Sequence, residues 1–109
     1  IMKEIKAIVK PFKANEILNQ LVLAGYPNLT VTLAEGTGNF QSDESTLSTN
    51  FSITNSKVAK IVIVCDDSEV EKIIGIIGKN AHTGNPGDGI IYVTSVDKVH
   101  SIRRGMGNG

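Results

Sequence analysis

Residues 83–89 read Thr-Gly-Asn-Pro-Gly-Asp-Gly, and an apolar stretch, Ile-Ile-Tyr-Val, follows them directly. Three glycines and one proline within seven residues give a backbone that can turn sharply and approach a ligand closely. Successive amide N–H groups in such a loop can form a concave site for an anion. A tight connection into an edge strand would have the same composition, so this segment alone leaves both interpretations open.

Residues 37–56 form a second unusual segment, because nine of these twenty residues carry a hydroxyl group. A loop this long inside a compact domain is usually functional or disordered. A merely flexible insertion is one interpretation. A second interpretation is a loop with a specific contact. Four apolar side chains favour it, because they would not stabilise a plain linker: Phe40, Leu47, Phe51 and Ile53. These side chains could anchor the loop on a partner or fold it back on the domain. We expect a loop that is mobile in the free protein and that contacts a partner through them.

The composition is that of one electrically balanced domain. The 109 residues include eleven basic and eleven acidic side chains, so no bulk attraction to nucleic acid or to an anionic membrane is expected. Cys65, the one cysteine, lies in an apolar run, which indicates a reduced core residue and a cytoplasmic protein. His82 and His100 are far apart and are read as surface residues, so no metal site is expected. No signal peptide and no apolar stretch near about 18 residues is found, so nothing indicates a membrane span.

Hydrophobic periodicity predicts the elements that must position these segments. Apolar residues alternate with polar ones in the strands and recur at helical spacing in the helices. The predicted strands are residues 2–9, 28–35, 57–65 and 90–94, with a short extension at 96–102. The predicted helices are residues 14–24 and 69–79. Gly25 ends the first helix, and Asp66-Asp67-Ser68 caps the second.

The order strand, helix, strand, strand, helix, strand is that of the ferredoxin-like α+β fold, also called the split βαβ arrangement. Two helices on one face of the sheet leave its other face open. The strands at 57–65 and 90–94 are apolar on both faces, so the sheet would expose an apolar patch unless it packs on copies of itself. We therefore expect a homo-oligomer. The whole chain, 1–109, is one domain, with a flexible loop at about 37–56 and a tail at about 104–109.

Four segments resemble the PII signalling proteins. The first is residues 2–13, Met-Lys-Glu-Ile-Lys-Ala-Ile-Val-Lys-Pro-Phe-Lys. The second is Leu29-Thr30-Val31-Thr32, followed by Gly36-Thr37-Gly38 at the mouth of the long loop. The loop at 83–89 and the C-terminal segment at 99–105 resemble two further family segments. All four fall in the family's order, so the resemblance covers essentially the whole chain.

The resemblance implies a homotrimer of ferredoxin-like subunits with adenine-nucleotide sites in the clefts between them. It implies that the long loop inserts into a membrane transporter or a metabolic enzyme, and that in many members 2-oxoglutarate binds beside a magnesium ion. The protein would be a cytoplasmic regulator that answers to a small-molecule effector, recruited to the membrane where its partner is a transporter. It would not be an enzyme. The residues assigned to nucleotide binding on this basis are Thr30, Gly36, Gly38, Lys57, Gly87, Asp88, Gly89, Arg103 and Arg104.

The chain departs from the family pattern at groups that would hold phosphate or metal. Asn39 and Phe40 replace an arginine and a glutamine, and phenylalanine offers magnesium no oxygen ligand. Ile90 stands where the family has a lysine, and Ser101 where it has the first of two arginines. A triphosphate needs several charge-assisted donors. We therefore expect ADP or AMP as the ligand rather than ATP, without magnesium and 2-oxoglutarate.

Other functions remain open at this point. A ferredoxin-like trimer could have lost nucleotide binding and sense another small molecule or anion. An acylphosphatase-like enzyme has the same order of elements but uses an arginine in the first strand–helix turn, where residues 10–13 read Lys-Pro-Phe-Lys. No nucleophile–base pair supports catalysis either. Two histidines and one cysteine disfavour a CutA-like or metal-binding trimer.

Overall fold

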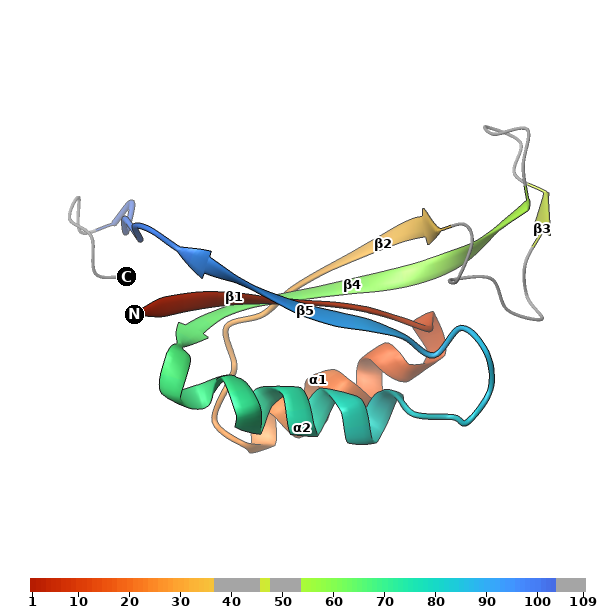
Figure 1. Ribbon diagram of the computed structural model, residues 1–109, viewed down its shortest axis with the longest axis horizontal. Helices are drawn as coiled ribbons and strands as arrows, with labels where there is room; N and C mark the ends of the chain where they lie inside the picture. Colours follow the sequence, from red (N-terminus) through yellow and green to blue (C-terminus); the bar gives the residue numbers. More distant parts are fainter. Residues whose placement is uncertain (37–45, 48–53, 104–109) are drawn as a thin grey trace.

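The computed structural model describes residues 1–36, 46–47 and 54–103, in which two helices cover one face of an antiparallel sheet (Figure 1). The strands are β1 (Met2–Val9), β2 (Thr30–Gly36), β3 (Thr46–Leu47), β4 (Thr54–Asp66) and β5 (Gly89–Val96). The helices are α1 (Ala14–Leu23) and α2 (Val70–Ala81). Each follows a short 3-10 turn, η1 (Pro11–Lys13) before α1 and η3 (Asp67–Glu69) before α2.

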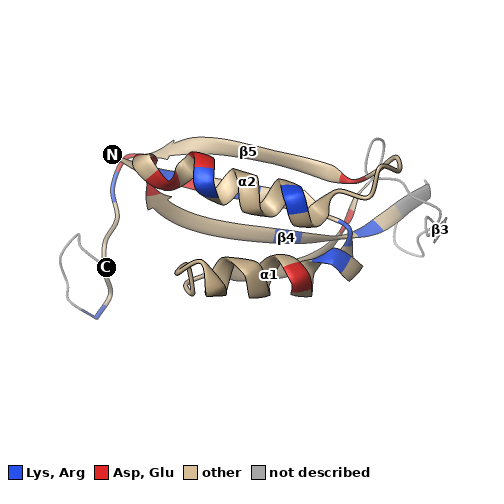
Figure 2. Ribbon diagram, turned by 90° about the horizontal axis from the view of Figure 1, so that it is seen from below, with Lys and Arg blue, Asp and Glu red and all other residues tan. Residues whose placement is uncertain are grey.

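The sheet has the strand order β2-β4-β1-β5, with β3 added beside β4. β1 lies in the middle and pairs antiparallel with β4 and β5 along its whole length, from Met2 to Val9. Figures 1 and 2 show α1 and α2 side by side across the same face. This arrangement confirms the predicted ferredoxin-like α+β fold.

The core lies between the sheet and the two helices. Alternate residues of β1 face the helices, and the antiparallel register places alternate residues of β4 beside them. The largest fully buried side chains are Ile5, Ile17, Leu21, Ile61, Ile73 and Ile77. Burial of such a side chain stabilises the fold by about 1.5–3 kcal/mol. Cys65 belongs to this core as predicted: it is a free thiol, and burial raises its pKa.

The other face of the sheet carries no helix and exposes apolar side chains. The register places Val64 of β4 and both Ile90 and Tyr92 of β5 on this face. These side chains are 44%, 50% and 42% exposed, respectively. We call this surface, represented by Val64, Ile90 and Tyr92, the open face. The sequence analysis predicted such an apolar surface from strands that are apolar on both sides.

Several predicted boundaries were wrong. β4 begins at Thr54 rather than at residue 57, and β3 pairs with it at Asn55 and Thr54, inside the segment expected to be loop. The polar residues there carry no hydrophobic signal, so only the pairing shows the strand. Of the expected extension at 96–102, only Val96 is in a strand, as the last residue of β5. The neighbouring strand β1 begins at Met2, the partner of Val96, so the chain beyond Val96 has no residues of β1 to pair with.

Candidate functional site

The glycine loop, residues 83–89, connects α2 to β5 at one end of the sheet (Figure 1). Gly84, Gly87 and Gly89 have φ values of +84°, +85° and +122°. Residues with a Cβ atom rarely adopt such values, so the turns of this loop require glycine. At Gly89 a Cβ atom would also stand 2.0 Å from the carbonyl oxygen of Ile8, because β5 begins directly against the backbone of β1.

The carboxylate of Asp88 holds the glycine loop together from the inside. Its Oδ2 accepts hydrogen bonds from the N–H of Thr83 at 2.8 Å and of Gly84 at 3.0 Å. Its Oδ1 accepts one from the hydroxyl of Thr83, whose oxygen accepts the N–H of Asn85 at 3.1 Å. These hydrogen bonds, that of the Thr83 hydroxyl first, hold the pKa of Asp88 well below its usual range. The amides of Thr83 and Gly84 therefore bind the loop's own carboxylate rather than an external anion.

Lys10 joins the glycine loop to the end of β1. Its Nζ lies 3.4 Å from Oδ1 of Asp88 and donates a hydrogen bond of 3.4 Å to Oγ1 of Thr83. The sequence analysis assigned Lys10 no role in the site, because Thr83 lies 73 positions further along the chain. The local signal is Pro11, since a proline restricts the residue before it to extended backbone. Lys10 has φ −65° and ψ 135°, as this restriction requires.

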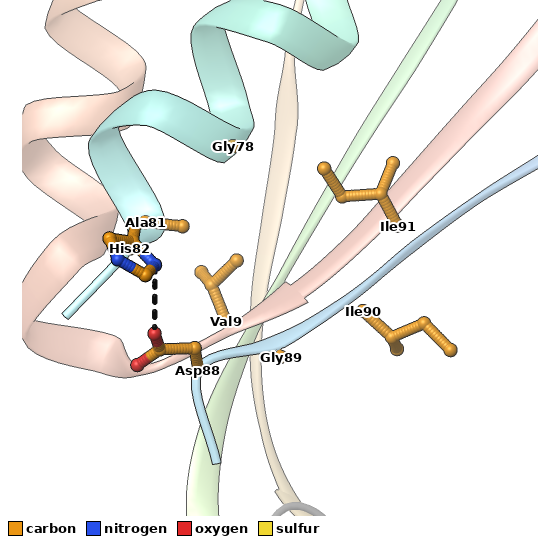
Figure 3. Close-up of a pocket in the computed structure, with 8 residues that line it drawn as sticks. All are labelled: Val9, Gly78, Ala81, His82, Asp88, Gly89, Ile90 and Ile91. Carbon is orange, nitrogen blue, oxygen red and sulfur yellow. Dashed lines mark ion pairs between the residues drawn. The ribbon is translucent and has the colours of Figure 1, made fainter. Parts of the chain in front are cut away.

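A cleft of about 240 Å³ opens between the end of α2 and the beginning of β5 (Figure 3). Its lining residues are Val9, Gly78, Ala81, His82, Asp88, Gly89, Ile90 and Ile91. Most of them are apolar or glycine. The polar end is formed by His82 and Asp88, with 3.5 Å between Nδ1 and Oδ2. Such a cleft can take a small apolar group that carries a polar end.

A second cleft, of about 330 Å³, lies where β2 ends and β4 begins. It is lined by Pro11, Leu33, Ala34, Glu35 and Lys57. Glu35 and Lys57 are partners in the register of β2 and β4, and both are exposed. Figure 1 shows that this cleft's strands reach the same end of the sheet as the glycine loop.

Comparisons with known proteins agree with this architecture. The family model described as Nitrogen regulatory protein P-II matches residues 2–106 of the chain. The chain belongs to the P-II family. It is 40% identical over 109 residues to the nitrogen regulatory protein P-II of Azospirillum brasilense. The alignment covers 99% of this chain and 97% of that protein. It is 40% identical over 105 residues to nitrogen regulatory protein P-II 2 of Methanothermobacter thermautotrophicus, at coverages of 95% and 91%.

A solved P-II structure has the same fold. The crystal structure of Arabidopsis thaliana PII bound to citrate is similar at a TM-score of 0.76 and 28% identity, covering 95% of this chain and 82% of that one. The resemblance stated from four short segments is thereby confirmed. This P-II chain is a signal-transduction regulator with the ferredoxin-like fold of its family.

The structure separates the residues that were predicted to bind a nucleotide into two groups. Gly36, Lys57 and the glycine loop lie at the end of the sheet where β2 ends and β5 begins. Arg103 belongs to the segment 97–103, which follows β5 and lies at the opposite end (Figure 1). The eight residues of β5 span roughly 25 Å. A single P-II chain therefore does not bring Arg103 to the glycine loop.

The remaining predicted residues fall elsewhere. Thr30 is exposed at the first position of β2, at the far end of that strand from Gly36. Leu47 lies in β3, opposite Thr54 of β4. The other predicted residues lie outside the described part of the chain: Gly38, Phe40, Phe51, Ile53 and Arg104.

The described residues contain neither a cluster of metal ligands nor a membrane-spanning helix. Within residues 1–36, 46–47 and 54–103, no three His, Cys, Asp or Glu side chains lie close enough together to hold a metal ion. No helix among these residues has the length and apolar character needed to cross a membrane. His82 and His100 are exposed, as the sequence analysis predicted.

Proposed function

We propose that this P-II protein is a homotrimeric regulator that binds an adenine nucleotide in the clefts between its subunits. The segment 37–56 would control a membrane transporter or a metabolic enzyme through Phe40, Leu47, Phe51 and Ile53. The protein would act in the cytoplasm and carry out no reaction on the nucleotide. The residues proposed to contact the nucleotide are Thr30, Gly36, Gly38, Lys57, Gly87, Asp88, Gly89, Arg103 and Arg104.

The separation of the predicted site into two groups carries this proposal. In a ring of identical subunits, the segment 97–103 of one copy can lie against the glycine loop of the next, which a single chain cannot achieve across the length of β5. The open face supplies apolar surface for such an assembly, because side chains exposed there would leave water on association. Each site would then combine the glycine loop of one subunit with the segment 97–103 of the next, so every chain would contribute to two sites.

The choice of nucleotide follows from the donors that remain. Asp88 already engages the amides of Thr83 and Gly84. A phosphate group would therefore rely on other amides of the glycine loop and on the cations Lys57 and Arg103. We propose ADP or AMP over ATP, since this set is small for a triphosphate. Magnesium and 2-oxoglutarate are left out because Phe40 cannot ligate a metal ion.

A second candidate ligand is a multivalent carboxylate. The Arabidopsis thaliana PII structure, which shares this fold, is described as bound to citrate. Carboxylates and phosphates use the same kind of donors, namely amide N–H groups, lysine and arginine. A trimer that has lost nucleotide binding could therefore still sense an anion of this class.

Thermal unfolding of the full chain in the presence of each ligand separates these functions. A ligand that binds only the folded protein adds about 2.7 kcal/mol of stability at a hundredfold excess over its Kd. We expect ADP and AMP to raise the Tm more than ATP, cyclic AMP, 2-oxoglutarate or bicarbonate do, with ribose 5-phosphate as the control for phosphate alone. Chromatography after incubation should recover ADP unchanged.

Each other outcome points elsewhere. A Tm raised by citrate alone would replace the nucleotide proposal with the carboxylate proposal. Release of phosphate from ADP would indicate an enzyme. No response to any nucleotide would reject nucleotide binding.

A further inference from the structure

The side chain of Lys10 is unusual among lysines because it is only 12% exposed, compared with 25% for its partner Asp88. Removing an ammonium group from water is costly unless a counter-ion and hydrogen-bond acceptors replace the lost water. The acceptors that meet Lys10 are Oδ1 of Asp88 and Oγ1 of Thr83, both at 3.4 Å. Both belong to the glycine loop, so the ion pair fastens that loop to β1.

Lys10 is itself held at a rigid point of the fold. It lies between the last residue of β1 and Pro11, and its carbonyl oxygen accepts the N–H of Lys13 at 3.0 Å as η1 begins. The extended backbone required before proline sets the direction of its side chain. A group anchored on a strand end positions a loop more accurately than a neighbour within the same loop does.

A single carboxylate, that of Asp88, links the ammonium group of Lys10 to the amides of the glycine loop. Asp88 accepts the Lys10 ammonium at Oδ1, and at Oδ2 it accepts the amides of Thr83 and Gly84. The other basic side chain facing Asp88 is that of His82, which is 75% exposed and therefore surrounded by solvent. Lys13 lies nearby in sequence but pairs at 3.7 Å with Glu16 in the first turn of α1.

We propose that Lys10 is a positioning residue for the nucleotide site: its ammonium holds Asp88 and Thr83, and through them it sets the shape of the glycine loop. Lys10 acts through Asp88 and does not contact the phosphate groups. This inference rests on the proposed nucleotide binding for its function, but the part that concerns loop shape can be measured without any ligand.

Amide hydrogen exchange of the unliganded protein tests the loop. Lys10→Met removes the charge and keeps the length of the side chain. Loss of one charge-assisted contact changes an equilibrium constant about tenfold or more, here that between the closed and the open loop. The amides of Thr83 and Gly84 should therefore exchange about tenfold faster. Lys10→Arg should restore slow exchange. Lys13→Met, which removes the neighbouring lysine, should leave these amides unchanged.

Calorimetric titration with ADP tests the consequence for binding. We expect Lys10→Met to raise the Kd for ADP about tenfold, Lys10→Arg to recover most of the affinity, and Lys13→Met to match the wild type. Thermal unfolding without ligand serves as the measure of general destabilisation. Recovery by arginine is the readout that a purely structural loss would not produce.

The results can also overturn the inference. Wild-type exchange rates at Gly84 in Lys10→Met would show that Lys10 does not hold the loop. Faster exchange with unchanged ADP affinity would show that the loop shape it holds is irrelevant to binding. If the wild-type protein binds no nucleotide, the proposed function fails while the exchange experiment still decides the loop. If Lys10→Met does not fold, Lys10→Gln replaces it in both assays, with the same expected losses.

Discussion

At the scale of single residues, Gly89 and Gly84 provide a matched pair for the steric demands of the glycine loop. A Cβ at Gly89 would meet the backbone oxygen of Ile8 at 2.0 Å, whereas one at Gly84 meets nothing closer than the ring of His82 at 4.0 Å. We predict that Gly89→Ala lowers the free energy of unfolding by about 3 kcal/mol or more, since the backbone of β1 cannot yield. Gly84→Ala should cost only about 1–2 kcal/mol, the penalty of a positive φ.

Urea denaturation of both variants measures this difference. Equal losses for the two glycines would show that backbone conformation, and not contact with β1, sets the requirement at Gly89.

Arg103 is the side chain that we predict to contribute most to phosphate binding. It is exposed in the segment after β5, where a neighbouring subunit could meet it. Arg103→Ala should weaken ADP binding by about 1.5–3 kcal/mol, the value of a hydrogen bond to a charged group. Lys98→Ala removes the same charge from the same segment and should leave the affinity nearly unchanged. Titration calorimetry checks both variants, and an equal effect of the two would reduce the role of Arg103 to net charge.

At the scale of elements, the glycine loop should depend on pH through Asp88. Its folded-state pKa is lowered, so its contribution to stability is present above the unfolded-state value of about 3.9 and is lost as the pH falls below it. The difference in unfolding free energy between the wild type and Asp88→Asn should therefore be largest near pH 6. It should shrink steadily below about pH 4. Urea titrations at several pH values measure it, and a difference that stays constant would argue against an ionised Asp88 as the centre of the loop.

The mobility of the segment 37–56 is predicted from its composition, which is polar with four apolar side chains. Ordering its backbone would cost roughly 1–2 kcal/mol per residue. Burial of Phe40, Leu47, Phe51 and Ile53 at about 1.5–3 kcal/mol each offsets only part of that cost. We predict fast amide exchange over residues 39–45 and 48–53, on either side of β3, in the free protein and slow exchange once a regulated partner is bound. Strong protection in the free protein would leave the proposed signalling mechanism without its moving part.

At the scale of the whole molecule, the open face should be covered by further copies of the chain. Light scattering should give a mass near three times the 11.6 kDa of one chain. Tyr92→Lys replaces an aromatic side chain of this face with a second ammonium group opposite Lys6, its partner in the register, and should lower the mass toward that of a monomer. Leu23→Lys alters a side chain that is more exposed, 78% against 42%, but lies on the helical side, and it should leave the mass unchanged. A monomer mass for the wild-type protein would contradict both the proposed trimer and the proposed site between subunits.

The elements of the fold could be predicted because their signals are local. Alternation in residues 2–9 and helical spacing in residues 14–24 depend only on which side of a segment meets the core. β1 agrees with its prediction at both ends, and α1 ends within one residue of it. The beginning of β4 was missed because Thr54 and Asn55 are polar and owe their strand conformation to pairing with β3. Pairing partners are not encoded in the periodicity of one segment.

The sequence by itself determined the ferredoxin-like order of elements, the family and the identity of the glycine loop, because each depends on residue types along a continuous stretch of chain. Only the tertiary structure showed that the carboxylate of Asp88 accepts hydrogen bonds from amides of its own loop, and that Lys10, far away in sequence, forms an ion pair with this carboxylate. Only the tertiary structure placed Arg103 and the glycine loop at opposite ends of the sheet. The physical reason is the same in both cases: hydrogen bonds and ion pairs form between groups that folding brings together, and their distance in space is not a property of the sequence between them.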